Sequence, residues 1–314
     1  MYCIDVHHHI VPQHYADAIG DIGALGSSGK VPNWSVQGAL ELMDEAGIDA
    51  GITSLSSRGV LPLNAAEANK LARWCNEFAA KMMSEHPGRF GMFATIPLQT
   101  MAGALTELAF AYDELRADGI CLLSNYDGSY LGDAYFWPLY EELNRRAAVV
   151  FVHPASPASL PSLGGMSPSM LEFPFDTTRA AASLLFSGVL SSFPAIRWIL
   201  SHAGGATPYL AGRLALLSEN RPDLQSKANG DVLGLLKKLY FDSALSTSQT
   251  GFKALRDFVP DTQLLFGTDY PFGPKRQMLR AAQDLKGLEL PPETTSAIRS
   301  SNALRLFPRF GKYI

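Results

Sequence analysis

The sequence predicts a (β/α)8 barrel, built as a single domain over residues 1–314. Short apolar segments alternate with amphipathic helical segments, eight of each kind along the chain. Segments such as 149–152 and 264–266 are continuously apolar, as expected of parallel strands that are buried on both faces. The length of 314 residues also suits one barrel. A doubly wound open sheet is the structural alternative.

The elements follow one another from the N-terminus. The first strand lies in the stretch 3–12, which begins apolar and closes at Pro12. Ser35 begins the first expected helix as its N-terminal cap, and Gly47 ends it. The other seven strands are expected at residues 48–55, 89–96, 119–123, 147–153, 196–202, 238–243 and 263–269. Helices are expected after them at residues 65–85, 101–118, 134–146, 177–192, 207–219 and 247–258. Two short helices finish the chain.

Composition excludes several classes of protein. Apolar residues make up 47% and charged residues 18% of the chain, which is typical of a soluble globular protein. A net charge of −4 provides no basic surface for nucleic acid. The sequence shows no secretory leader and no membrane-length apolar run, so we expect a cytoplasmic protein that binds neither membrane nor nucleic acid. Cys3, Cys75 and Cys121 are expected to be buried, reduced thiols.

The first strand carries three consecutive histidines. Side chains alternate along a strand, so His7 and His9 should share one face while His8 points to the other. Two imidazoles on one face of a strand end can bind one metal ion. The pattern predicts that His8 is dispensable for metal binding.

Three more strand ends finish in residues that bind metals or transfer protons. These residues are His153, His202 and Asp269. In a barrel, the carboxyl ends of all strands meet at one mouth, where active sites lie. Each residue alone is more often structural, but five at one mouth indicate a metal site. No lysine occurs in residues 119–126 to bridge two metals, which favours one ion with open positions for water or substrate.

These motifs resemble the metal-dependent decarboxylases related to amidohydrolases, a family typified by aminocarboxymuconate-semialdehyde decarboxylase. The matching pieces are Asp5-Val6-His7-His8-His9 with Pro12, Phe151-Val152-His153-Pro154, Ser201-His202-Ala203-Gly204-Gly205 and Gly267-Thr268-Asp269-Tyr270-Pro271-Phe272. The resemblance implies that His7, His9, His153 and Asp269 bind one divalent ion, usually Zn²⁺, with Mn²⁺ as the alternative. It also implies that His202 works as an acid/base beside the ion.

Within this family the sequence is most similar to the branch that acts on 6-methylsalicylate, through the stretches 123–128 and 171–179. One departure concerns the substrate. The muconate enzymes carry a substrate-binding arginine where this chain reads Ser27-Ser28-Gly29-Lys30. A substrate with two carboxylates would need that cation, so the difference favours a small aromatic monocarboxylate. Arg58 is a candidate substitute, with a surface arginine as the alternative.

The implied reaction is non-oxidative decarboxylation, in which Asp269 delivers a proton to the ring carbon and His202 assists. The sequence leaves open which of the two is the immediate acid. A mononuclear hydrolase of a lactone or amide is the alternative activity, and a non-catalytic binding protein explains none of the strand-end residues. The resemblance further implies a homodimer or larger homo-oligomer. In it Arg213, on the helix after the sixth strand, serves the neighbouring subunit's site; a solvent-exposed arginine is the alternative.

Overall fold

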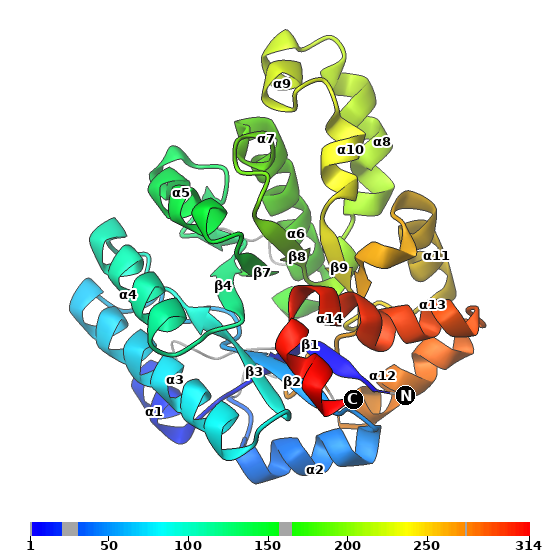
Figure 1. Cartoon of the computed structure of the whole chain (residues 1–314). Coiled ribbons are helices and arrows are strands. Elements are labelled where there is room, and N and C mark those ends of the chain that lie inside the picture. Colours follow the sequence, from blue (N-terminus) through cyan, green and yellow to red (C-terminus); the bar gives the residue numbers. More distant parts are fainter. Residues whose placement is uncertain (1, 21–30, 157–164, 274) are drawn as a thin grey trace.

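The protein folds into a nearly closed barrel of eight parallel strands surrounded by helices (Figure 1). The structure, a computed structural model, describes residues 2–20, 31–156, 165–273 and 275–314. The strands stand in chain order: β1 (Ile4–His9), β2 (Ala50–Ser54), β3 (Phe90–Thr95), β4 (Gly119–Leu123), β7 (Val149–His153), β8 (Arg197–Leu200), β9 (Tyr240–Asp242) and β10 (Leu264–Leu265). The predicted (β/α)8 fold is confirmed.

The barrel closes between its first strand and the segment that follows its last. The Val6 N–H donates to the Phe266 carbonyl at 2.9 Å, and the His9 N–H donates to the Tyr270 carbonyl at 2.7 Å. Regular β10 is only two residues long, shorter than the predicted strand 263–269. The chain turns at Asp269, whose φ of 66° is incompatible with a strand.

The helices pack around the outside of the sheet (Figure 1). The larger ones are α2 (Val36–Ala46), α3 (Ala65–Glu85), α4 (Met101–Asp113), α5 (Trp137–Arg145), α6 (Pro168–Ser187), α8 (Thr207–Ser218), α11 (Gln249–Phe258) and α12 (Lys275–Gly287). The caps of α2 are the predicted ones: Ser35 Oγ accepts the Gly38 N–H at 3.0 Å, and Gly47 adopts a left-handed conformation with φ 66°.

Some helix boundaries differ from the prediction. Helix α6 begins at Pro168, nine residues before the expected start at residue 177, although it contains Pro174. Pro168 suits a first turn because that position needs no N–H donor. Thr178 Oγ1 donates to the Pro174 carbonyl at 2.8 Å and so supports the helix beyond the interruption. Helix α4 ends at Asp113, five residues before the predicted residue 118.

Several short elements were not predicted. They are α1 (Gln13–Ile19), the hairpin of β5 (Asn125–Tyr126) and β6 (Ser129–Tyr130), α9 (Pro222–Lys227) and α10 (Val232–Lys237). The helix predicted over residues 177–192 is divided at Gly188 into the end of α6 and α7 (Val189–Ser192). At the C-terminus the structure has α13 (Pro292–Ser296) and α14 (Asn302–Leu306), joined by the π-helical turn η5 (Ala297–Ser301). Elements of four to seven residues carry too little hydrophobic periodicity to be recognised.

The barrel interior is a packed core below the mouth. Phe93 and Phe151 stack with ring centroids 5.2 Å apart, and Phe307 from the C-terminal segment packs against Phe93. His7 lies directly next to Phe151, at 4.9 Å between centroids. The core therefore fills the barrel up to the level of the histidines. The three cysteines are buried and free, as expected. Among the described helices, none is long and apolar enough to cross a membrane.

Candidate metal centre

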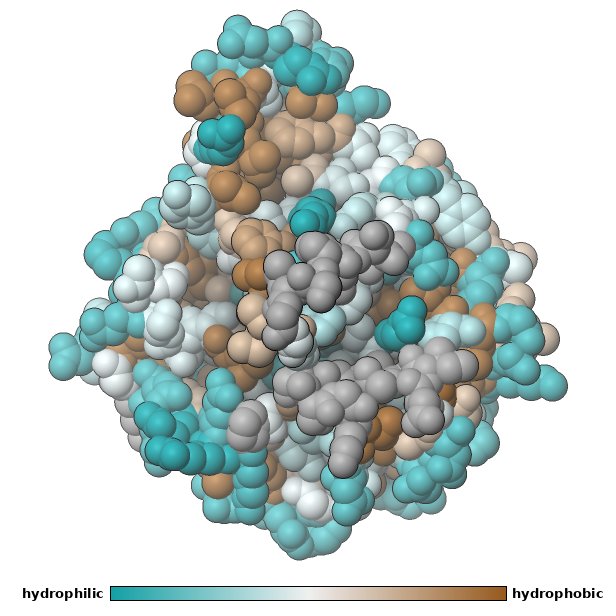
Figure 2. All heavy atoms as spheres, turned by 180° about the vertical axis from the view of Figure 1, so that it is seen from behind, coloured by the Kyte–Doolittle hydropathy of each residue, from teal (hydrophilic) through white to brown (hydrophobic). Residues whose placement is uncertain are grey.

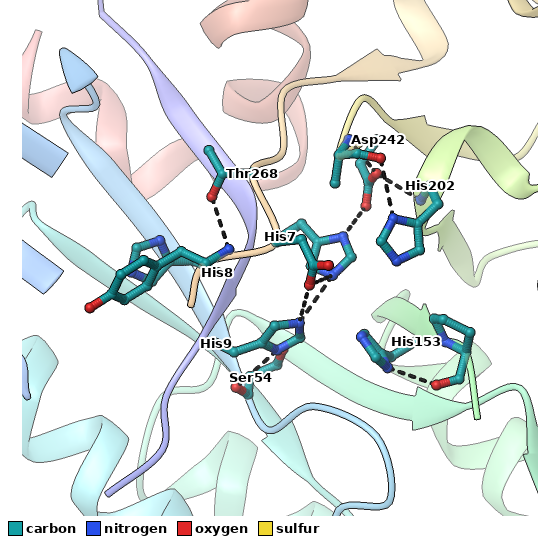
Figure 3. Close-up of polar contacts among 12 residues, drawn as sticks. His7, His8, His9, Ser54, His153, His202, Asp242 and Thr268 are labelled. Carbon is teal, nitrogen blue, oxygen red and sulfur yellow. Dashed lines mark hydrogen bonds and ion pairs between the residues drawn. The ribbon is translucent and has the colours of Figure 1, made fainter. Parts of the chain in front are cut away.

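Four of the predicted residues converge at the C-terminal mouth of the barrel; Figure 3 labels the three histidines among them. His7 and His9 come from β1, His153 ends β7, and Asp269 follows β10. Their possible ligand atoms all lie within 4.8 Å of one another, and all four residues are buried. His8 points away from this group: its ring stacks on Tyr270 at 4.7 Å, and its Nδ1 lies 3.1 Å from Asp5 Oδ2. The strand alternation predicted for the three histidines is therefore present.

In each of the three converging histidines, Nδ1 forms a hydrogen bond with a partner on the side away from the centre. The partners are Asp242 Oδ2 for His7 at 2.8 Å, the Pro154 carbonyl for His153 at 2.9 Å, and for His9 the Ser54 Oγ at 3.0 Å and the Ser54 carbonyl at 3.4 Å. A carboxylate and a carbonyl only accept, so the Nδ1 atoms facing them carry the proton. The Nε2 atoms are then the ones that present lone pairs toward the centre, as in metal-bound histidines.

The close spacing of nitrogen and oxygen lone pairs in the centre favours the binding of a cation. His7 Nε2 and His9 Nε2 are 3.0 Å apart, and Asp269 Oδ1 lies 3.2 Å from each. That carboxylate oxygen is buried and has no hydrogen-bond donor of normal geometry. Lone pairs crowded this closely in a dry site are costly unless a cation lies among them. Three imidazole nitrogens and one carboxylate oxygen are a donor set that Zn²⁺ accepts. The residues fit a single divalent ion.

In the metal-free protein, a proton on His7 supplies part of that charge. Burial opposes protonation of His7, but the negative charges of Asp242 and Asp269 outweigh it and raise its pKa to about 10. Burial lowers the pKa of His9 to about 4 and that of His153 well below its usual range. The pKa of Asp269 is held well below its usual range: burial alone would raise it, and positive His7 overcomes that effect.

His202 lies beside the centre and is not one of the four converging residues. It begins the short turn η3 (His202–Gly204) after β8, and its ring centroid is 4.8 Å from that of His7. The Ala244 carbonyl accepts from Nδ1 at 3.2 Å, which leaves Nε2 available on the cavity side. Burial lowers the His202 pKa, so the imidazole is neutral at neutral pH. A neutral imidazole with a free Nε2 can accept a proton.

A cavity of about 370 Å³ opens onto the centre. It is large enough for a small aromatic molecule. Its lining residues are Ser56, His153, Ser169, Met170, Phe173, Pro174, His202, Leu245, Ser246, Asp269, Phe272, Gly273 and Gln277. Among these described residues there is no lysine or arginine. The walls are therefore mixed: five apolar side chains, among them the rings of Phe173 and Phe272, face serines, a glutamine, two histidines and the carboxylate of Asp269.

The two predicted arginines do not line this cavity. Arg58 is exposed and borders a separate small cavity that shares Ser56 with the site. Arg213 is exposed on α8 and is not among the residues that line the cavity. The segment 27–30, where the muconate enzymes carry their arginine, lies outside the described residues.

The sequence reasoning missed the residues that hold the converging histidines. Asp242 Oδ2 accepts from His7 Nδ1, Ser54 Oγ lies 3.0 Å from His9 Nδ1, and Asp5 accepts from the His7 N–H at 3.0 Å and from Thr268 Oγ1 at 2.6 Å. A carboxylate in a buried strand was a usable signal for both acids, because it needs a partner: Asp5 is the second residue of β1 and Asp242 the last of β9. The carbonyls of Pro154 and Ala244 belong to the main chain, so no side-chain type in the sequence indicates their role.

Comparison with known proteins agrees with the fold and the site. A profile of the amidohydrolase family matches residues 4–309. The chain belongs to this family. The predicted relationship to its decarboxylases is confirmed by the named relatives described next.

The first relative is a 6-methylsalicylic acid decarboxylase of Penicillium expansum, 36% identical over 98% of this chain and 96% of the relative. A protein of the same name from Aspergillus aculeatus is also 36% identical, over 98% of this chain and 96% of its own length. Among solved structures, a protein described as amidohydrolase II aligns with a TM-score of 0.90 at 28% identity, over 98% of this chain and 99% of that one.

Proposed function

We propose that the protein is a metal-dependent, non-oxidative decarboxylase of a small aromatic 2-hydroxy acid of the 6-methylsalicylate type. One observation carries the proposal: a buried group of three histidines and Asp269 lies beside His202 at a cavity that has phenylalanine rings in its wall and no lysine or arginine among its described lining residues. The 36% identity to named 6-methylsalicylic acid decarboxylases supports the same substrate class. The whole chain, 1–314, acts as one catalytic domain in this proposal.

His7, His9, His153 and Asp269 are the proposed ligands of one divalent ion, with Zn²⁺ first and Mn²⁺ second among candidates. When bound, the ion supplies a Lewis acid that stabilises negative charge on the substrate's carboxylate and hydroxyl oxygens. The ring of the substrate can pack against the apolar part of the wall, which includes Phe173 and Phe272. A second carboxylate would find no cationic partner among the described lining residues, which supports a monocarboxylate. A role for Arg58 in substrate binding stays a prediction.

Decarboxylation of such an acid requires a proton at the ring carbon that bears the carboxylate. A C–H bond forms there, the bond to the carboxylate carbon breaks, and carbon dioxide leaves as the ring recovers its aromatic electrons. Asp269 and His202 both line the cavity, so either can move the proton. Because the pKa of Asp269 is held low, Asp269 must first receive a proton. The proposed donor is the substrate's hydroxyl, which the ion would make more acidic when bound, and the phenolate that remains takes a proton from water as the product leaves. In this proposal Asp269 delivers the proton and His202 assists.

We further propose a homodimer in which Arg213 reaches the partner's site. Exposed apolar residues gather on the projection that carries α8, α9 and α10, visible at the top of Figure 2. On α8, Tyr209 is 84% exposed, and Leu216 and Leu217 are also exposed. Arg213 lies four residues from Tyr209 and Leu217, so it shares their side of the helix. An apolar helix surface around an arginine is typical of an interface. A cytoplasmic location stays a prediction.

A substrate screen tests the proposed activity. Protein loaded with Zn²⁺ or Mn²⁺ is offered 6-methylsalicylate, other 2-hydroxybenzoates, a benzoate without the hydroxyl, a lactone and an amide. The expected result is release of carbon dioxide and a phenol from the 2-hydroxybenzoates alone. Hydrolysis of the lactone or amide without release of carbon dioxide would refute the decarboxylase and favour a hydrolase.

A further inference from the structure

Asp242, at the end of β9, is a buried carboxylate that contacts two functional histidines at once. Its Oδ2 lies 2.8 Å from His7 Nδ1. Its Oδ1 accepts the main-chain N–H of His202 at 2.9 Å and that of Ala244 at 2.9 Å. The Ala244 carbonyl in turn accepts from the His202 ring. Figure 3 shows Asp242 between the two imidazoles.

The contact with the His202 main chain matters because that residue has an unusual backbone. His202 adopts φ 54° and the next residue, Ala203, φ 56°. Left-handed conformations cost free energy in residues other than glycine, and they persist only where surrounding contacts fix them. The hydrogen bond from the His202 N–H to Asp242 is one such contact. It sets where the His202 ring stands relative to His7.

We infer that Asp242 is a positioning residue that fixes His7 as an Nε2 metal ligand and places His202 beside it. The inference rests on the proposed metal centre. Oδ2 holds the proton of His7 on Nδ1, so that Nε2 keeps its lone pair toward the other ligands. Oδ1 holds the turn that begins at His202. One carboxylate thereby sets the distance between the proposed ligand and the proposed acid/base.

An asparagine has nearly the same shape but cannot serve all three donors. The carboxylate receives three N–H groups on two oxygens, whereas an amide has one accepting oxygen and one NH₂ group. If the amide oxygen keeps the two main-chain donors, its NH₂ faces His7 Nδ1. The favoured tautomer of His7 then carries the proton on Nε2, where the metal should bind. The opposite orientation leaves two buried main-chain donors unpaired, which costs more.

The test compares Zn²⁺ affinity in Asp242→Asn and Asp176→Asn with that of the unchanged protein. Asp176 is a matched control because it is an equally buried carboxylate with three donors of its own: Ser124 Oγ, Asn125 Nδ2 and Tyr130 OH. None of these partners is a converging histidine. Affinity is measured by chelator competition, and circular dichroism checks that each variant folds. We expect Asp242→Asn to bind Zn²⁺ on the order of 10–100-fold more weakly and Asp176→Asn to stay within about twofold.

A second measurement needs no variant. Long-range ¹H–¹⁵N spectra of the Zn²⁺-loaded, unchanged protein report which nitrogen of His7 carries the proton. We expect a protonated Nδ1 and a metal-bound Nε2, and the reverse arrangement would overturn the inference even if Asp242→Asn failed to fold. Unchanged affinity in Asp242→Asn, or equal losses in both variants, would also overturn it. A failure of the unchanged protein to bind Zn²⁺ would instead refute the proposed metal centre.

Discussion

The affinity of the centre for metal should rise with pH, with a slope set by His7. The pKa of His7 is raised to about 10 in the metal-free protein, so at pH 6 to 8 this residue carries a proton that the metal must displace. The other groups carry no proton that the metal must displace. Burial lowers the pKa values of His9, His153 and His202, so these rings are neutral, and Asp269 is ionised. Binding should therefore release one proton per ion.

The release of one proton per ion sets how steeply the metal affinity depends on pH. When one proton is displaced, the dissociation constant falls about tenfold per pH unit as long as the pH is below the pKa of His7. Between pH 6 and pH 8 the affinity should rise about 100-fold, which corresponds to about 2.7 kcal/mol of binding free energy. Above pH 10, where His7 has lost its proton, the dependence should disappear.

Chelator competition at several pH values measures the slope. Calorimetry in two buffers of different ionisation enthalpy counts the released protons. His8→Ala is a suitable control because His8 points away from the centre, so its slope should match that of the unchanged protein. A flat profile would show that His7 is neutral and that the charges of Asp242 and Asp269 do not act as reasoned. A slope of two would show that a second histidine is protonated.

Four other variants test the roles of single residues. His7→Ala should lose metal, as measured by elemental analysis. His8→Ala should keep it and instead lower the free energy of unfolding by about 2–4 kcal/mol in a urea titration, because a buried ring stacked on its neighbour is removed. His202→Ala should keep most of its metal and lose on the order of 10²–10⁴-fold in kcat, the range for loss of a general acid/base. Mixed dimers of His202→Ala and Arg213→Ala chains should regain part of the activity that each lacks alone.

Each of these has an outcome that would contradict it. Equal metal loss from His7→Ala and His8→Ala would mean that both rings face the ion. A His202→Ala protein stripped of metal would make His202 a main ligand. Mixed chains that exchange subunits, as followed by native mass spectrometry, yet stay inactive would show that Arg213 does not act across an interface.

The barrel and the converging residues were predictable because both depend on regular patterns. Parallel strands buried on both faces are continuously apolar, and their carboxyl ends must meet at one mouth. Strand alternation alone predicts that His7 and His9 share one face and that His8 points to the other. Strong caps at Ser35 and Gly47 likewise fixed the bounds of α2.

What could not be predicted depends on contacts between distant parts of the chain. Asp242 lies 235 residues from its partner His7, and nothing local to β9 says which ring it meets. The carbonyls of Pro154 and Ala244 act through the main chain, which every residue shares. The start of α6 was misplaced because local rules end a helix at an internal proline, whereas here Thr178 supplies a supporting hydrogen bond to Pro174.

The central claim is that a single bound ion makes this site a decarboxylase, and a metal titration of activity tests it most directly. Protein stripped by a chelator is given 6-methylsalicylate, and Zn²⁺ or Mn²⁺ is added in steps while released carbon dioxide is measured. We expect no release without metal and a linear rise that stops at one equivalent per chain. Release that persists in the stripped protein, or that saturates only at two equivalents, would contradict the account.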